Sequence, residues 1–237
     1  MSGDLAVSNG SAEQKRTNYF VVIIFATMIL WALALFAFIA FRPIMVLPKI
    51  SLGPGYALVD QQGEMFTHED LRGSIVLYNF TYTGCAAPVC RETSSVMQEV
   101  AARLDEVDTF GIPVQMVTIS VDPERDSPEV LQAFAQQLGA EPESWHFLTG
   151  DANRLKWAVG GGFSVYYNEK EDGVIALDPA LMLLDSVGIL RAEYRTARPD
   201  VDIILRDIRL IAEEVQNRQG VGNVAYDAAH LFLCYPR

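Results

Sequence analysis

An uninterrupted apolar run near the start of the chain precedes segments whose apolar residues recur with the periods of strands and helices. Residues 19–41 contain no charged side chain over 23 positions. At about 1.5 Å of rise per residue such a helix would measure roughly 35 Å, and a hydrocarbon core is about 30 Å thick. A cleaved signal peptide is the alternative, but its apolar region covers only about 7–15 residues. We therefore predict one transmembrane helix at residues 19–41.

Short apolar runs and helical repeats alternate from residue 56 onward. Two short strands are predicted around a turn at Gly63, followed by a helix start capped by Thr67. The further predicted strands are 74–81, 114–121, 147–149, 180–185 and 189–194, and the predicted helices are 91–106, 127–138, 153–159 and 201–215. This order predicts an α/β sandwich with a mixed central sheet, preceded by the transmembrane helix.

The same pattern divides the chain into five parts. Residues 42–55 carry three prolines and two glycines and are predicted to form an extended linker. The predicted parts are a polar tail at 1–18, the helix at 19–41, the linker at 42–55, the folded domain at 56–215 and a C-terminal tail at 216–237.

Charge changes this picture in two ways. Lys15 and Arg16 precede the apolar run while Arg42 and Lys49 follow it, so the basic residues leave the orientation in the membrane open. The net charge of −12 argues against nucleic acid as a partner, because the phosphate backbone would repel the domain. Solubility explains this acidity without any specific acidic site.

Two cysteines, Cys85 and Cys90, lie where the apolar strand 74–81 gives way to a helical segment. A thiolate near a helix N-terminus is stabilised by the helix dipole, which suits redox or metal chemistry. Cys85 would then be the attacking thiol and Cys90 the resolving thiol. An inert disulfide in an oxidising compartment explains the pair equally well.

Four segments resemble the SCO/SenC proteins in their order and spacing. They are Phe80-Thr-Tyr-Thr-Gly-Cys-Ala-Ala-Pro-Val-Cys90, Thr118-Ile-Ser-Val-Asp-Pro-Glu-Arg-Asp-Ser-Pro-Glu129, Leu148-Thr-Gly150 and Leu183-Leu-Asp-Ser-Val-Gly-Ile-Leu190. The resemblance covers residues 56–215. It implies a thioredoxin-like fold and a membrane-anchored factor that helps deliver copper to cytochrome c oxidase.

The resemblance also implies a location and partners. The protein would cross the inner (plasma) membrane once, with its C-terminal domain on the periplasmic or extracytoplasmic side. Its partners would be the membrane and a respiratory oxidase or subunits of another respiratory complex.

The chain departs from the family pattern at the site itself. Family members hold the two cysteines as Cys-x3-Cys, whereas four residues separate Cys85 from Cys90 here. The family histidine that follows an aspartate is replaced by Pro179, which cannot bind a metal. Thiolates bind copper(I) well and imidazole is a good third ligand, so Cys85 and Cys90 alone make a weaker copper site. His68, His146 and His230 are the only histidines available to complete it, and of these His230 is favoured, only because a mobile C-terminal tail could reach the site.

Pro179 also has a positive interpretation. The redox relatives of this family carry a proline, usually in a cis peptide bond, that packs against the cysteine pair. The candidate catalytic set is therefore Cys85, Cys90 and Pro179, and the activity is at most that of a thiol–disulfide oxidoreductase. A non-catalytic accessory subunit of a respiratory complex remains the alternative. Cys234, in an apolar tail, fits either docking onto a partner or packing onto the domain.

Overall fold

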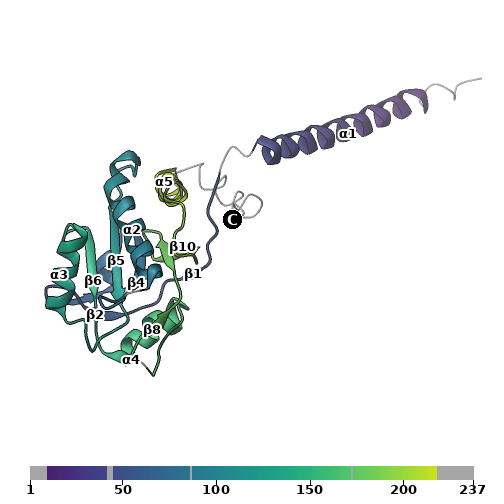
Figure 1. The fold of residues 1–237 in the computed structure, drawn as a ribbon. Coiled ribbons are helices and arrows are strands. Elements are labelled where there is room, and N and C mark those ends of the chain that lie inside the picture. Colours follow the sequence, from purple (N-terminus) through teal and green to yellow (C-terminus); the bar gives the residue numbers. More distant parts are fainter. Residues whose placement is uncertain (1–9, 42–44, 86, 172, 218–237) are drawn as a thin grey trace, which may run out of the picture. The chain divides into compact units, whose positions relative to one another are not determined.

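The computed structural model describes residues 10–41, 45–85, 87–171 and 173–217, and its contacts divide the chain into two units, Met1–Met45 and Val46–Arg237. The first unit contains helix α1 (Gly10–Phe41), labelled in Figure 1. Within it, Tyr19–Ala37 has a mean hydropathy of 2.7 over 19 residues. By length and composition this stretch is a candidate membrane span.

The second unit is built on a six-stranded mixed sheet (Figure 1). The strands run in the order β1 (Ser51–Leu52), β10 (Ile189–Tyr194), β9 (Leu181–Leu184), β4 (Ile75–Thr81), β5 (Val114–Ser120) and β6 (Trp145–Leu148). Strands β4, β5 and β6 are parallel, and β9, β10 and β1 pair antiparallel to their neighbours. The predicted α/β sandwich with a mixed sheet is therefore confirmed.

Helices and two small hairpins cover the sheet. Helices α2 (Pro88–Arg103), α3 (Pro128–Leu138) and α5 (Val201–Asn217) share one core cluster, and α4 (Ala152–Leu155) with the π-helical turn Lys156–Gly162 belongs to the other. The hairpins are β2 (Ala57–Val59) with β3 (Met65–Thr67), and β7 (Tyr167–Glu169) with β8 (Ile175–Leu177). Short 3-10 turns lie at His68–Leu71 and Leu104–Glu106.

Strand β4 separates the two cores. All seven of its residues are buried, as expected of a central strand with parallel and antiparallel neighbours and both faces covered. Ile75 and Leu77 point into the cluster that contains α2 and α5, while Tyr78 and Phe80 point into the cluster that contains α4. This alternation follows from the two-residue period of a strand.

Local signals set the helix boundaries near the cysteines. Helix α2 begins at Pro88, three residues before the predicted start, because proline suits the first helical position. This places Cys90 in the first turn of the helix. Helix α3 begins as predicted: Ser127 Oγ accepts a hydrogen bond from Val130 N at 3.4 Å, and Pro128 occupies the first position.

The segment at 46–55 differs from the predicted linker, because it is part of the folded unit. Val46 and Leu47 are each only 1% exposed, and Ser51–Leu52 pairs with β10. A Cβ added at Gly162 would lie 2.3 Å from Pro54 Cβ, so glycine allows this segment to pack against the π-helical turn. The apolar side chains and this close approach hold the segment on the domain.

A buried ion-pair cluster around Arg191 fastens the same segment. Arg191 is 2% exposed and donates to Asp185 at 3.1 Å and to Glu214 at 2.6 Å. Its guanidinium also donates to the carbonyls of Leu47 (2.7 Å) and Pro48 (3.1 Å). One side chain therefore joins β10, α5, the turn after β9 and the start of the folded unit.

The β6 edge of the sheet is also covered. The backbone N–H of Phe147 donates to Gln61 Oε1 at 2.8 Å, and Val59 and Thr149 form an antiparallel bridge just beyond the strand. Gln61 is only 4% exposed. The β2–β3 hairpin thus shields the edge of β6.

Candidate functional site

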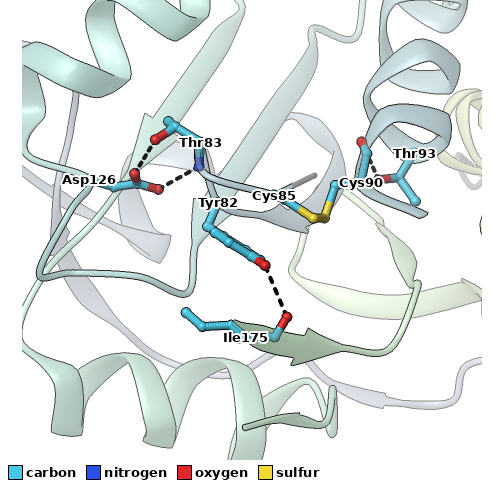
Figure 2. Close-up of a disulfide and its surroundings, with 7 residues drawn as sticks. All are labelled: Tyr82, Thr83, Cys85, Cys90, Thr93, Asp126 and Ile175. Atoms are coloured by element: carbon cyan, nitrogen blue, oxygen red, sulfur yellow. Dashed lines mark hydrogen bonds between the residues drawn. A yellow bond between two sulfur atoms is a disulfide. The ribbon is translucent and has the colours of Figure 1, made fainter. Parts of the chain in front are cut away.

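Cys85 and Cys90 are joined by a disulfide at the carboxyl end of β4 (Figure 2). Cys85 lies on the loop after the strand, and Cys90 is the third residue of α2; their Cα atoms are 6.1 Å apart. Cys85 is half-buried and Cys90 is 5% exposed. An incoming thiol therefore has better access to the sulfur of Cys85.

Two side chains of the preceding residues fix the loop that carries Cys85. Thr83 donates its backbone N–H to Asp126 Oδ2 at 3.0 Å, and its hydroxyl also donates to that carboxylate (Figure 2). On the other side, the Tyr82 hydroxyl donates to the Ile175 carbonyl at 3.1 Å. The loop is thereby tied both to the α3 side and to the β7–β8 side of the sheet.

Asp126, for which no role was predicted, holds the loop that carries Cys85. Its side chain is fully buried and also accepts a hydrogen bond from the Ser120 hydroxyl at the end of β5. Its position in the Asp-Pro-Glu-Arg-Asp-Ser-Pro segment was a usable signal, because a short polar loop after a buried strand often carries functional residues. Its partner Thr83 is 43 residues away, so sequence alone did not reveal the contact.

A cavity of about 380 Å³ lies beside the disulfide. Both cysteines line it, together with residues from the end of β4 and from α2 and α3. The other lining residues are Thr81, Tyr82, Thr83, Arg91, Ser94, Ser95, Gln98, Phe134 and Leu138. The cysteine pair is therefore next to a space large enough for a small molecule or a side chain of a partner.

A larger cavity of about 600 Å³ lies past the carboxyl end of β5. Ile175, whose carbonyl binds Tyr82, is part of its lining. Arg125 bridges two carboxylates of the lining, Asp122 at 2.7 Å and Glu169 at 3.2 Å. These pairings neutralise much of the charge at that cavity.

Pro179 lies in the segment between β8 and β9 and is half-buried. Its peptide bond is trans, as are all the peptide bonds of the described residues, whereas the corresponding proline of the redox relatives is usually cis. The N–H of Asp178 donates to the Tyr166 carbonyl at 3.0 Å. The hydrogen bonding of the β7–β8 hairpin therefore continues to the residue just before Pro179. Leu177 and Ala180, on either side, belong to the core cluster that includes Cys85 and Cys90.

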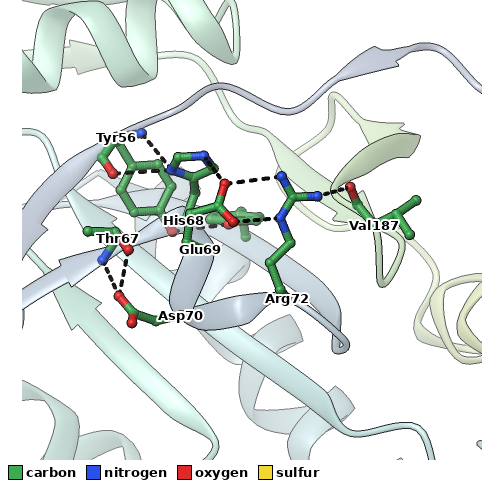
Figure 3. Close-up of polar contacts among 8 residues, drawn as sticks. Tyr56, Thr67, His68, Glu69, Asp70, Arg72 and Val187 are labelled. Atoms are coloured by element: carbon green, nitrogen blue, oxygen red, sulfur yellow. Dashed lines mark hydrogen bonds and ion pairs between the residues drawn. The ribbon is translucent and has the colours of Figure 1, made fainter.

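His68 is engaged in a network of its own (Figure 3). Its Nδ1 accepts a hydrogen bond from Tyr56 N at 3.3 Å, and its Nε2 lies 3.0 Å from Glu69 Oε1. Glu69 also pairs with Arg72, which donates to the Val187 carbonyl at 2.6 Å. His68 therefore has both ring nitrogens occupied, away from the cavity at the disulfide.

His146 lies on β6, and its Nε2 is 3.2 Å from Gln115 Oε1. Its ring packs on Phe66 with 4.6 Å between centroids, and burial lowers the pKa of its imidazole. His230 and Cys234 lie outside the described residues. Among the described residues, no three histidine, cysteine or acidic side chains gather as a metal site.

Comparisons with known proteins agree on one family. The SCO1/SenC family model matches residues 47–213. An SCO2-like protein of Rickettsia prowazekii is 34% identical over 119 residues, which are 50% of this chain and 54% of that protein. The chain thus spans about half the length of the curated relatives that it matches.

Solved structures agree with the fold. A SCO1/SenC family lipoprotein from Bacillus anthracis is 26% identical with a TM-score of 0.63, covering 70% of this chain and 97% of that one. Copper-bound ScoI of Arabidopsis thaliana is 24% identical with a TM-score of 0.59, covering 67% and 99%. BsSco, described as a member of the Sco family of cytochrome c oxidase assembly proteins, is 22% identical with a TM-score of 0.57, covering 70% and 96%.

These matches confirm the thioredoxin-like fold class. The matched region of the family model includes the β4 strand, the cysteine pair and the Asp126 loop, and it begins within the segment that Arg191 fastens to the sheet. The protein therefore belongs to the SCO1/SenC family.

Proposed function

We propose that this protein is a membrane-anchored factor that maintains thiols, or delivers copper, during assembly of a respiratory oxidase, with Cys85 and Cys90 as its working pair. The observation that carries the proposal is the disulfide at the carboxyl end of β4, half-accessible and beside a cavity of about 380 Å³. A disulfide serving only as a staple has no need of such access.

The thiol–disulfide step follows from this geometry. In the reduced pair, the thiolate of Cys85 attacks a disulfide of the partner; a mixed disulfide forms, and the partner's other sulfur leaves as a thiolate. The thiolate of Cys90, which the N-terminus of α2 stabilises, then attacks Cys85 Sγ. The Cys85–Cys90 bond forms and the partner's second sulfur leaves as a thiolate, so the partner is reduced and the pair is oxidised.

The reduced pair would offer copper(I) only two thiolate ligands. Thiolates are the soft ligands that copper(I) prefers, but neither His68 nor His146 lies among the residues that line the cavity. We therefore expect weaker and less selective copper binding than a site with two cysteines and a histidine would give. Thiol–disulfide maintenance is the better supported part of the proposal.

A second candidate is a non-catalytic accessory subunit of a respiratory complex. Two sequence features support it: by the resemblance, Pro179 takes the place of the family histidine, and four residues separate the cysteines. The variant Pro179→His tests whether that position still faces the pair. If it does, this change should tighten copper(II) binding, and Ala180→His, one residue along, should not.

The deciding experiment joins a redox titration to a copper titration on the full-length chain in detergent. For the working pair we expect a reduction potential above about −300 mV, since structural disulfides typically lie below that value. The reduced chain should bind one copper(I), and Cys85→Ser or Cys90→Ser should abolish this binding, whereas Cys234→Ser should not. A lower potential with no copper(I) binding would instead support the accessory subunit.

The proposal includes the topology and the partners. We propose that residues 19–41 cross the inner (plasma) membrane once, with residues 46–217 on the periplasmic or extracytoplasmic side, and that a respiratory oxidase is the partner. Protease added to intact spheroplasts should digest the folded unit. Protection of that unit until the membrane is lysed would contradict the orientation.

A further inference from the structure

The walls of the cavity beside the disulfide carry two hydroxyl groups. Thr81 and Ser94 both line it and are 2% and 7% exposed. Neither hydroxyl forms a hydrogen bond with another described residue, and neither is among the buried polar atoms that lack a partner. Both hydroxyls therefore reach the cavity, where water or a polar ligand next to the cysteines can bind to them.

The charge of the cavity is opposite to that of the protein. Arg91, next to Cys90 in the first turn of α2, is the only charged side chain among its described lining residues. Arg91 forms no ion pair with any described carboxylate, although the chain as a whole carries a net charge of −12. The buried carboxylate of Asp126 is not available to a ligand in this cavity, because Thr83 and Ser120 already donate hydrogen bonds to it.

We infer that this cavity binds a small thiol that bears a carboxylate, and that this thiol is a reductant of the Cys85–Cys90 disulfide. The inference rests on the proposed function and names a substrate class for it. The guanidinium of Arg91 pairs with the carboxylate, and the hydroxyls of Ser94 and Thr81 donate to its remaining lone pairs. A volume of about 380 Å³ admits such a molecule whole.

The reaction is balanced by two molecules of the thiol. The first, as thiolate, attacks Cys85 Sγ, forms a mixed disulfide and leaves the electron pair on Cys90 Sγ. The second attacks the sulfur of the first within the mixed disulfide and releases Cys85 as a thiolate, which takes up a proton. The protein disulfide is reduced to two thiols, and the small thiol is oxidised to its own disulfide.

Three thiols of different charge test the inference on the full-length chain in detergent at physiological ionic strength. They are 3-mercaptopropionate (anionic), 2-mercaptoethanol (neutral) and cysteamine (cationic). Alkylation and mass spectrometry of the Cys85–Cys90 peptide give the reduction rates, each corrected for the thiolate fraction and the nucleophilicity of the thiol. We expect the corrected rate to be highest for 3-mercaptopropionate, although the net charge alone would favour cysteamine.

Two variants and a matched control locate the effect. Arg91→Gln should lower the ratio of the 3-mercaptopropionate rate to the cysteamine rate by about two- to fivefold, the range that an exposed ion pair contributes. Ser94→Ala should lower the same ratio, whereas Arg209→Gln, which removes one surface charge from α5, should leave it unchanged. Glu129, with a pKa lowered by the Ser127 hydroxyl, lines the adjoining hollow of about 440 Å³, so Glu129→Gln should raise the ratio.

The outcomes separate this inference from the proposed function. If dithiothreitol fails to reduce Cys85–Cys90 in the folded chain, the proposed function fails. If dithiothreitol reduces wild type and all variants equally but Arg91→Gln leaves the ratio unchanged, the cavity holds only water and the small-thiol inference is overturned.

Discussion

Replacing Arg191 by methionine tests the buried ion-pair cluster that Arg191 forms with Asp185 and Glu214. Methionine has a similar length and no charge, so the change leaves the carboxylates of Asp185 and Glu214 buried without their shared cation. The side chains of the two acids are only 6% and 3% exposed. Breaking a buried pair in this way costs about 3–5 kcal/mol, a large part of a typical free energy of unfolding of roughly 5–15 kcal/mol.

The variant removes a contact from each carboxylate. Asp185 keeps hydrogen bonds from the backbone N–H groups of Val187 and Ile189, at 3.2 and 2.9 Å. Glu214 lies on α5 and loses its 2.6 Å contact with Arg191. The double variant Arg191→Met/Glu214→Met should be more stable than Arg191→Met alone, because it removes one of the two buried negative charges that the lost cation had offset.

Urea unfolding of the full-length chain in detergent measures these differences. Tryptophan fluorescence follows the transition, since Trp145 is 2% exposed and stacks on Phe147 with 5.4 Å between ring centroids. Lowering the pH should recover part of the lost stability of Arg191→Met, because the loss of a cationic partner raises the pKa of a buried carboxylate and favours its neutral form. A loss below about 1 kcal/mol, the upper range of surface pairs, or a double variant less stable than the single one, would refute this reasoning.

Three further changes test other parts of the structure. Asp126→Asn should destabilise the fold by about 1–3 kcal/mol, because the side-chain NH₂ group cannot accept the hydrogen bonds that Thr83 and Ser120 donate. It should also shift the reduction potential of the cysteine pair. An unchanged potential would show that Asp126 does not position the pair. Burial lowers the pKa of His146, so below about pH 6.5 the unfolded chain binds a proton that the folded chain does not. The free energy of unfolding should then fall as the pH drops through the folded-state pKa; His146→Gln should flatten this dependence in urea titrations, and an identical slope would contradict it. Gly162→Ala should lower the melting temperature because its Cβ would overlap Pro54, whereas Gly160→Ala, which meets no atom within 4 Å, should not; equal effects would show that the close approach is not tight.

The period of apolar residues was enough to predict the long elements and the place of the cysteine pair. Strand β4 and helix α5 have strong patterns, and Ser127 with Pro128 marks the start of α3. Strands of two or three residues, such as β1 and β7, are too short to show any period. They form because of pairing with distant partners, which a local pattern does not contain.

The site was predictable in its location but not in its surroundings. Cys85 and Cys90 follow a buried strand, and that context is visible in the sequence. The contact between Thr83 and Asp126 and the cavity that includes Arg91 arise from loops brought together by the parallel pairing of β4 and β5. The β7–β8 ladder, which extends as far as Asp178 beside Pro179, was not predicted from the sequence.

The covering of both sheet edges has a consequence for how copies of this chain behave at high concentration. An open edge strand invites the strand of a neighbouring molecule and leads to aggregation. Here the two-residue β1 pairs with β10, and Gln61 Oε1 accepts a hydrogen bond from the backbone N–H of Phe147 at the outer edge of β6. Neither rim of the described sheet offers a long free ladder, so we expect edge-to-edge strand pairing between copies to be disfavoured.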